Sequence, residues 1–357
     1  MKVVLTIQHP AHVHFFRHAI GELEAGDDEV FVFARENDLA VPLLERYGIA
    51  HEVLAGPPSS MAGLAAVQAT YELRLLRRAR AIEPDVMAAI GGVAVAHVAP
   101  LVGARSVVFV DNEGVASHRL MAPFADVICT PRRFEGDFGE KHRRYDGYHE
   151  LAYLHPDRFE PDPDALRERG VEPDDRYFLL RFRRWDALHD VGEAGLSRAG
   201  KRRLVSELAD RGTVYITSTD PLPDAFEPYR LPVAPERIHD LLYYADLYAG
   251  DSATMATEAA VLGTPAVRVQ SFAGRDRDMS NFRELAGYGL LRSTPDEDRA
   301  IDSALALADA PPGRQSARRD RLLAEKIDVT EFLVSLLRAQ NRSGDGRSSH
   351  PRPRIRR

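Results

Sequence analysis

The first predicted strand is followed by a cluster of histidines. His9, His12, His14 and His18 come directly after the apolar run 3–7. An imidazole titrates near neutral pH, so it can serve as a general base, and it is also a common zinc ligand. The i, i+4 spacing of His14 and His18 suits a metal pair on a helix, but no Glu stands between them as in the HExxH motif, and no third ligand is adjacent in the sequence. We therefore expect no metal site, and we favour His12 as a base because it lies in the loop or the first helical turn.

A strand–turn–helix pattern in the second half of the chain carries a further candidate site. The stretch 246–269, DLYAGDSATMATEAAVLGTPAVRV, predicts a short strand, a helix and another strand. Backbone N–H groups and hydroxyls at a helix amino terminus favour a phosphate, which makes Asp251, Ser252 and Thr254 candidate diphosphate contacts. Glu258 lies about two turns further along, where its carboxylate could accept hydrogen bonds from a ribose diol. An ordinary capped helix that ends at a glycine explains the same pattern without a ligand.

The loop 181–190 contains paired arginines and the single tryptophan of the chain. The guanidinium groups of Arg183 and Arg184 suit phosphate oxygens. Trp185 could stack on a base or a sugar. A solvated basic turn and a tryptophan that fills a domain interface are the alternatives.

Two more loops place polar side chains after predicted strands. The stretch 109–114, FVDNEG, could orient a substrate hydroxyl or supply a base, and an Asx turn closed by glycine is its alternative. The stretch 274–282, GRDRDMSNF, is either a second ligand loop or a plain charged loop. The candidate residues are Asp111, Asn112 and Glu113 in the first loop, and Arg275, Asp276 and Asn281 in the second.

Alternating strands and helices must position these groups. Apolar runs of strand length alternate with helical patterns in both halves of the chain, which indicates βαβ units and parallel sheets. We predict an α/β protein with two doubly wound, Rossmann-type domains that face a cleft. The expected parts are an N-terminal domain at 1–154, a linker at 155–174, a C-terminal domain with closing helices at 175–340, and a disordered basic tail at 341–357. Sheets of this kind bind ligands beyond the carboxyl ends of their strands, where all the candidate loops lie.

The individual elements follow from apolar periodicity and turn residues. The predicted strands are 3–7, 30–34, 85–90, 106–110, 125–130, 177–181, 213–217, 247–249 and 266–269. The predicted helices are 13–25, 40–47, 61–82, 93–101, 200–211, 235–244, 252–262, 298–308 and 314–340.

Composition narrows the class of protein. The chain is 44% hydrophobic and 28% charged, as in a globular protein, and its single Cys129 excludes an internal disulfide framework. A net charge of −7 argues against a dedicated nucleic-acid-binding protein. The uncharged stretch 86–104 has the length of a membrane span, but its two adjacent glycines and its proline favour a strand, a turn and a buried helix. The amino terminus predicts a strand rather than a signal peptide. We therefore expect a cytoplasmic protein with at most peripheral membrane contact.

Several of these segments resemble known families. The motif GDSATMATEAAVLGTPAVR at 250–268 resembles the donor-nucleotide motif of sugar-nucleotide enzymes with the GT-B fold. It is similar to that of UDP-N-acetylglucosamine 2-epimerases, and of the transferase that adds N-acetylglucosamine to the peptidoglycan lipid precursor. The segments QHPAHVHFFRHAI, VDNEGVASHRLMAPFADVICTP, YDGYHELAYLHP and RFRRWDALHDVG resemble an archaeal family of uncharacterised predicted glycosyltransferases. The resemblance covers roughly residues 1 to 295.

The resemblance implies a role for each candidate loop. In a GT-B enzyme the C-terminal domain would bind the nucleotide sugar, with Glu258 at the ribose and Ser252 at the diphosphate. The loop 181–190 would face the nucleotide, 236–239 would hold the base with backbone groups, and the loop that contains Arg275 would contact the donor sugar. The loop after the first strand would border the reaction site.

The resemblance favours a glycosyltransferase over an epimerase. The strand-end aspartate that an epimerase needs is Gly92 in this chain, and the histidine expected before the paired arginines is Phe182. Among the acid–base positions of the epimerases, only the one at Glu113 has a matching residue in this chain. We therefore expect transfer of a sugar from a nucleotide-sugar donor, UDP-linked, to a glycan, lipid or small-molecule acceptor, with no metal or other cofactor and no nucleic-acid partner. The candidate catalytic groups are His12, Asp111 and Glu113. An epimerase-like enzyme and a non-catalytic nucleotide-sugar-binding protein remain as alternatives.

Overall fold

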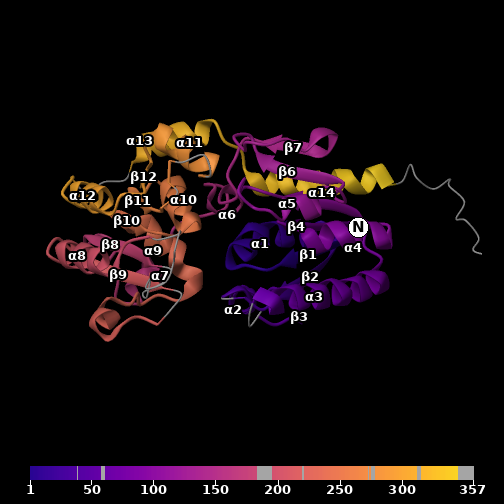
Figure 1. The fold of residues 1–357 in the computed structure, drawn as a ribbon, viewed down its shortest axis with the longest axis horizontal. Coiled ribbons are helices and arrows are strands. Elements are labelled where there is room, and N and C mark those ends of the chain that lie inside the picture. The colour runs from indigo at the N-terminus through magenta and orange to yellow at the C-terminus, as the bar shows by residue number, and fades with distance from the viewer. Residues whose placement is uncertain are drawn as a thin grey trace, which may run out of the picture.

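The computed structural model describes residues 1–37, 39–57, 61–182, 195–218, 221–271, 273–274, 278–311 and 315–344. Within these ranges the strands form two parallel sheets, one on each side of the molecule in Figure 1. The predicted pair of doubly wound α/β domains is confirmed.

The first sheet has seven strands among the described residues, in the order β3-β2-β1-β4-β5-β6-β7. Its strands are β1 (Lys2–Ile7), β2 (Glu29–Arg35), β3 (Glu52–Ala55), β4 (Val86–Ile90), β5 (Arg105–Phe109), β6 (Val127–Pro131) and β7 (His142–Tyr145). The helices that precede the second sheet are α1 (Pro10–Ala25), α2 (Ala40–Arg46), α3 (Met61–Ile82), α4 (Val93–Val102), α5 (His118–Met121), α6 (Leu151–Leu154) and α7 (Pro163–Arg167), with the 3₁₀ helix η1 (Gly139–Lys141).

The second sheet has the order β12-β11-β10-β8-β9. Its strands are β8 (Tyr177–Phe182), β9 (Thr213–Ser218), β10 (Leu247–Gly250), β11 (Ala266–Val269) and β12 (Leu291–Thr294). The remaining helices are α8 (Arg198–Ala209), α9 (Ile238–Tyr244), α10 (Ala253–Leu262), α11 (Ser280–Tyr288), α12 (Glu297–Ala308), α13 (Ser316–Ala324) and α14 (Val329–Gly344), with the 3₁₀ helices η2 (Asp224–Tyr229) and η3 (Pro235–Arg237).

The strand orders determine where a ligand can bind. In the first sheet the order reverses beside β1, which pairs in parallel with both β2 and β4. In the second sheet it reverses beside β8, which pairs with β9 and β10. A crevice opens at such a switch point, beyond the carboxyl ends of the strands. The loops that follow β1, β8 and β10 are therefore the expected ligand-binding loops.

The sequence did not predict three short strands, the helices α5, α6 and α11, or a break in the last predicted helix. The strands β3, β7 and β12 have four residues each, and β7 reads HRRY, so none of them shows a long apolar run. The helix predicted over 314–340 is two helices, because the Asp328 carboxylate accepts hydrogen bonds from the backbone N–H of Thr330 (2.8 Å) and Glu331 (3.3 Å) and so starts α14 anew.

The last helix returns to the first sheet. The α14 helix packs against α1, α6, β4 and β5, as its course in Figure 1 shows. The closing helices expected within 175–340 are therefore divided between the two sheets. Because α14 extends through Gly344, the start of the expected tail 341–357 is helical, and residues 345–357 lie outside the described residues.

The connection between the sheets is packed. The expected linker 155–174 contains α7, whose amino end is capped by the Asp162 side chain, and it buries Leu166 and Val171. One apolar cluster includes side chains from β5, α6 and β8, so hydrophobic contacts continue from one sheet to the other through α6. None of the helices in the described ranges has both the length and the apolar character that a membrane span requires.

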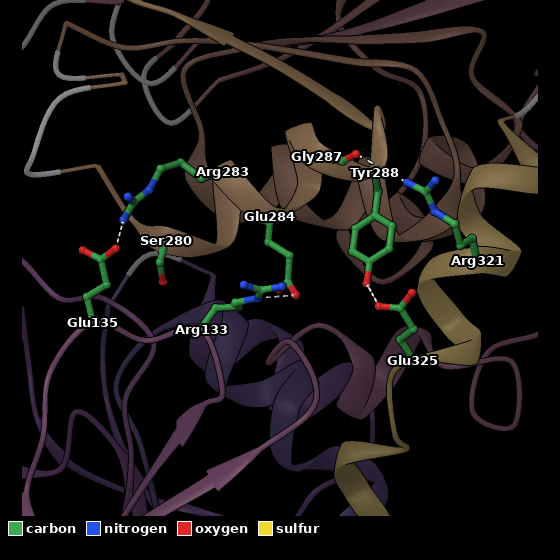
Figure 2. Close-up of a pocket in the computed structure, with 9 residues that line it drawn as sticks. All are labelled: Arg133, Glu135, Ser280, Arg283, Glu284, Gly287, Tyr288, Arg321 and Glu325. Atoms are coloured by element: carbon green, nitrogen blue, oxygen red, sulfur yellow. Dashed lines mark hydrogen bonds and ion pairs between the residues drawn. The ribbon is translucent and has the colours of Figure 1, made fainter.

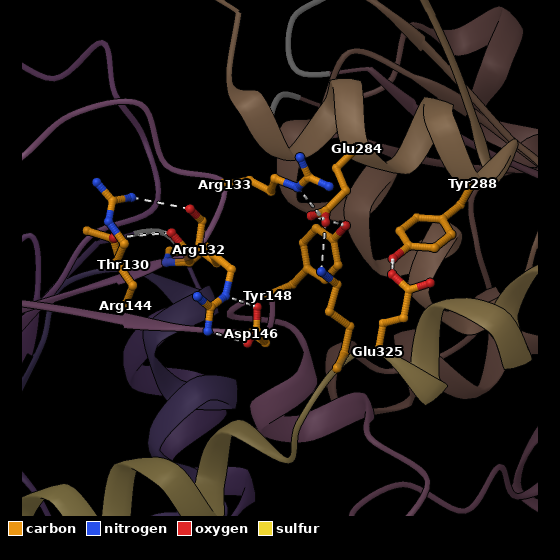
Figure 3. A network of polar contacts seen from close by, with 11 residues as sticks. Thr130, Arg132, Arg133, Arg144, Asp146, Tyr148, Glu284, Tyr288 and Glu325 are labelled. Carbon is orange, nitrogen blue, oxygen red and sulfur yellow. Dashed lines mark hydrogen bonds and ion pairs between the residues drawn. The ribbon is translucent and has the colours of Figure 1, made fainter.

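A buried carboxylate joins the two domains beside this cluster. Glu284 on α11 accepts hydrogen bonds from Tyr148 Oη (2.7 Å) and Lys326 Nζ (2.7 Å), and from Arg133 Nε (3.0 Å), as Figure 3 shows. The side chains of Glu284 and Lys326 are 8% and 6% exposed. In the same region, Glu135 forms an exposed ion pair with Arg283 across the domain boundary.

We predict that Glu284→Ala lowers the free energy of unfolding, measured by urea denaturation, by about 3–5 kcal/mol, because it leaves the Lys326 ammonium buried without its partner. The matched control is Glu135→Ala, which breaks the exposed pair and should cost about 1 kcal/mol or less. Equal losses in the two variants would contradict the assignment of Glu284 as the main interdomain contact.

Candidate functional site

A cavity of about 630 Å³ lies at the two switch points, between the domains. The first domain lines it with the loop after β1 and the start of α1, which contribute His9 and His14. The second domain contributes Arg181, at the end of β8, and the amino end of α10 with Ser252 and Thr254. The predicted ligand-binding loops of the two domains are thus brought together at one cavity.

The turn before α10 is fixed by its backbone. At Gly250 a Cβ atom would lie 2.3 Å from the carbonyl oxygen of Arg181, so β8 and β10 approach too closely for any side chain there. The backbone N–H of Asp251 donates to the same carbonyl (3.2 Å). Ser252 Oγ accepts a hydrogen bond from the N–H of Met255 (3.3 Å) and caps α10. The first N–H groups of a helix have no partner within the helix, so this end of α10 offers donors to the cavity.

Glu258 is a buried carboxylate on the cavity wall. Its Oε1 accepts a hydrogen bond from Tyr153 Oη (2.8 Å) and lies 2.9 Å from His239 Nε2. Burial by itself raises the pKa of this carboxyl, but His239, Tyr153 and Arg181 outweigh burial and bring the pKa below its ordinary value. Glu258 is therefore ionised at neutral pH, and His239 Nε2 donates to it.

Two more side chains on the cavity wall, His14 and Arg181, were not among the predicted site residues. The His14 ring packs edge-on against His239, with 4.6 Å between ring centroids, and burial together with His239 lowers the pKa of His14 well below its ordinary value. This shift favours the neutral form of His14 over the cation. Arg181 Nη1 donates to Thr217 Oγ1 (2.9 Å), which places a guanidinium at the cavity. Its sequence signal was a charged residue inside the apolar strand YFLLRF.

A second group of titratable side chains lies where β5 ends. Asp111 Oδ2 is 3.2 Å from Nδ1 of His149, which the sequence analysis did not select. His12 is close to both, and its Nδ1 accepts from the backbone N–H of Gln8 (3.4 Å). Burial, aided by His9 and His149, lowers the pKa of His12 to about 3. Two of the predicted catalytic residues, His12 and Asp111, are thus brought together.

Glu113, the third predicted catalytic residue, has a different position. Its Oε1 accepts hydrogen bonds from the backbone N–H groups of Ser280 (3.4 Å) and Glu135 (3.2 Å), and from the Ser280 hydroxyl. Ser280 and Glu135 belong to a second interdomain groove of about 600 Å³, shown in Figure 2. Ion pairs in that groove join Arg283 to Glu135 and Arg133 to Glu284. Glu113 therefore joins the two domains.

The other candidates are placed as follows. The Asx turn at 109–114 is confirmed, because Asn112 Oδ1 accepts from the N–H of Gly114 (3.0 Å). Asn281 is buried at the start of α11. Among the described residues no group of three or more His, Cys, Asp and Glu side chains is arranged to hold a metal ion. The candidates that lie outside the described residues are Arg183, Arg184, Trp185, Arg275 and Asp276.

Solved structures with a similar fold cover almost the whole chain. The UDP-N-acetylglucosamine 2-epimerase of Methanocaldococcus jannaschii has a TM-score of 0.65 at 13% identity, over 95% of this chain and 100% of that one. The corresponding epimerase of Neisseria meningitidis has a TM-score of 0.63 at 12% identity, over 95% and 100%. The spinosyn forosaminyltransferase SpnP has a TM-score of 0.62 at 16% identity, over 95% and 99%. At such identities these similarities show the fold, and they confirm the predicted GT-B arrangement.

The sequence comparisons give a family. A search of curated proteins found no match. Residues 1–334 match the model of a family described as a protein of unknown function, DUF354. Because this match spans nearly all of the described residues, the chain belongs to the DUF354 family.

Proposed function

We propose that this chain is a glycosyltransferase that moves a sugar from a nucleotide-sugar donor, UDP-linked, to a glycan, lipid or small-molecule acceptor, without a metal. The observation that carries the proposal is the ionised Glu258 on the wall of an interdomain cavity, beside the amino end of α10. A carboxylate accepts hydrogen bonds from a ribose diol, and a helix amino terminus favours a diphosphate. The cavity thus offers complementary groups to two adjoining parts of a nucleotide.

Structures of similar fold support a donor of this kind. The Neisseria meningitidis epimerase is bound to UDP-N-acetylglucosamine, and a structure of the Methanocaldococcus jannaschii epimerase contains UDP-N-acetylglucosamine and UDP. In this chain Arg181 adds a positive charge to the cavity, and His239 holds Glu258 rather than facing outward. Backbone groups near η3 remain the candidates for contact with the base.

Two positions favour transfer over epimerisation. At Gly92 a Cβ atom would lie 2.8 Å from Ala89 Cβ and 3.1 Å from a methyl group of Val108, so the site has no room for an aspartate without a shift of its neighbours. Phe182 is 1% exposed within the apolar cluster of the second sheet. Neither position can present the polar group that an epimerase would need there.

Transfer would use the two sides of the cleft differently. The acceptor oxygen forms a bond to the anomeric carbon while the bond from that carbon to the donor phosphate breaks, and the electron pair leaves with the nucleoside diphosphate. The amino end of α10 and Arg181 would stabilise the departing charge. The first domain would take the proton of the acceptor, with His12, Asp111 and Glu113 as the candidates.

The test is to incubate the purified protein with a panel of nucleotide sugars and to follow the products by phosphorus and proton NMR. Release of UDP and free sugar, which transferases produce slowly without an acceptor, is the expected result. Formation of the C2 epimer from UDP-N-acetylglucosamine would overturn the proposal in favour of the epimerase. Binding without either product would favour a non-catalytic binding protein.

We predict that Glu258→Gln weakens UDP binding by roughly ten- to a hundredfold, the equivalent of about 1.5–3 kcal/mol for a lost charged hydrogen-bond acceptor. The matched control is Glu135→Gln, which neutralises an exposed carboxylate in the other groove and should leave UDP affinity unchanged. Isothermal titration calorimetry measures both. Equal UDP affinity in wild type and Glu258→Gln would exclude the ribose role.

A further inference from the structure

The segment 148–153, YHELAY, sends side chains to both domains. Tyr148 donates to Glu284 in one groove, and Tyr153 donates to Glu258 at the cavity. Between them His149 turns toward Asp111, after β5 of the first sheet. The roles of the two tyrosines follow from their partners, whereas the proposed function assigns nothing to His149.

We propose that His149 is a positioning residue, which orients the Asp111 carboxylate toward the cleft, and that Asp111 takes the proton of the acceptor. This inference rests on the proposed function, since it selects one base from the three candidates.

His149 is buried, whereas the Asp111 carboxylate is partly exposed. The side chain of His149 is 8% exposed, and that of Asp111 is 28% exposed. The His149 ring is stacked with Tyr145, with an interplanar angle of 11°, and packs against Phe15, with 4.9 Å between ring centroids. These contacts fix the plane of the imidazole, so Nδ1 holds one orientation toward Asp111 Oδ2.

The environment of Nε2, the other ring nitrogen, explains why position 149 is a histidine. Within the described part of the chain, His149 Nε2 is buried and has no hydrogen-bond partner. A buried polar atom without a partner destabilises a fold. An aromatic hydrocarbon would fill the same space without that cost, so Nδ1, which lies 3.2 Å from Asp111 Oδ2, is the feature that such a ring would lack.

The charges around Asp111 favour its ionised form. Burial raises the pKa of its carboxyl, but the neighbouring His149 outweighs burial, so the pKa lies below its ordinary value. Burial, together with the charge of Asp111, raises the pKa of Glu150 well above its ordinary value, which favours a protonated Glu150 beside an ionised Asp111. The titratable groups that face Asp111 are His12 on α1, His118 on α5, Tyr145 on β7, and His149 and Glu150 before α6.

The two rival bases are less suitable. The Nδ1 of His12 already accepts a hydrogen bond from the backbone N–H of Gln8 (3.4 Å), so this nitrogen is occupied. The Oε1 of Glu113 accepts from Ser280 and Glu135 at the domain junction. Asp111 is therefore the group that receives the proton of the acceptor. At the same time the acceptor oxygen bonds to the anomeric carbon, and the nucleoside diphosphate leaves with the electron pair of the broken bond.

The first test requires no substrate. Carbon-13 NMR of protein with labelled aspartate carboxyls, with the Asp111 signal assigned through Asp111→Asn, gives the pKa of Asp111 in wild type, His149→Phe and His149→Asn. The amide of asparagine can replace the Nδ1 donor, whereas phenylalanine keeps only the ring. We expect the pKa of Asp111 to rise in His149→Phe and to stay near the wild-type value in His149→Asn. The control His155→Phe removes a largely buried histidine that pairs with Asp157 and should leave Asp111 unchanged.

An unchanged pKa of Asp111 in His149→Phe would overturn the proposal. A rise of equal size in His149→Asn would also overturn it, because the charge or the packing of the imidazole, rather than the N–H, would then be responsible. If His149→Phe does not fold, His149→Gln replaces it, since its amide reaches the Nε2 position and leaves Asp111 without the donor.

The second test uses release of UDP from UDP-N-acetylglucosamine as a function of pH. Loss of a general base lowers turnover by about 10²–10⁴-fold, so Asp111→Asn should show a loss of that size. In His149→Phe the acidic limb of the pH profile should move to higher pH, and His149→Asn should restore it. Wild-type turnover in Asp111→Asn would overturn the role of Asp111. Absence of UDP release from the wild type would instead count against the proposed function, while the NMR titration would still decide the role of His149.

Discussion

The arrangement of the two domains depends on the pairing of buried carboxylates at their junction. An ionised carboxylate is removed from water only when hydrogen-bond donors replace its hydration. Glu258 of the second domain meets this requirement through Tyr153, just before the connection between the sheets, and through His239. Glu284 meets it through Tyr148, Arg133 and Lys326. The segment 148–153 therefore donates a hydrogen bond to each of the two carboxylates. These two contacts fix the position of one sheet relative to the other.

This constraint also explains the chemistry of the cavity. The interactions that hold the domains together keep Glu258 ionised on the cavity wall, and they keep His14 neutral against His239. The second domain thus presents a fixed negative charge beside the donors of α10 and the guanidinium of Arg181. In the first domain, Asp111 Oδ2 lies 3.2 Å from Nδ1 of the buried His149. The charged groups on the cavity wall, Glu258 and Arg181, are thus held in place before a ligand binds, and such preorganised charges are how proteins stabilise charge that develops during a reaction.

Much of the fold could be predicted from the sequence, because parallel strands buried on both faces give long apolar runs. The helix predicted at 61–82 is α3 to the residue, while short polar strands such as β7 had no comparable signal. The loops of the site were identified because they follow strands in a doubly wound sheet. The contacts of His149 and Tyr153 were not predicted, since each depends on a partner from another element. Asp111 and Glu113 show the same limit, because two neighbouring acidic residues look alike in sequence although one lies beside histidines and the other joins the domains.

The central claim is that the interdomain cavity holds a nucleotide against α10. A crystal structure of the chain grown with UDP tests it most directly. We expect electron density for the ribose hydroxyls against Glu258 and for the diphosphate at the amino end of α10. Density for UDP in the other groove, beside Arg133 and Glu284, or an empty cavity at saturating UDP, would contradict it.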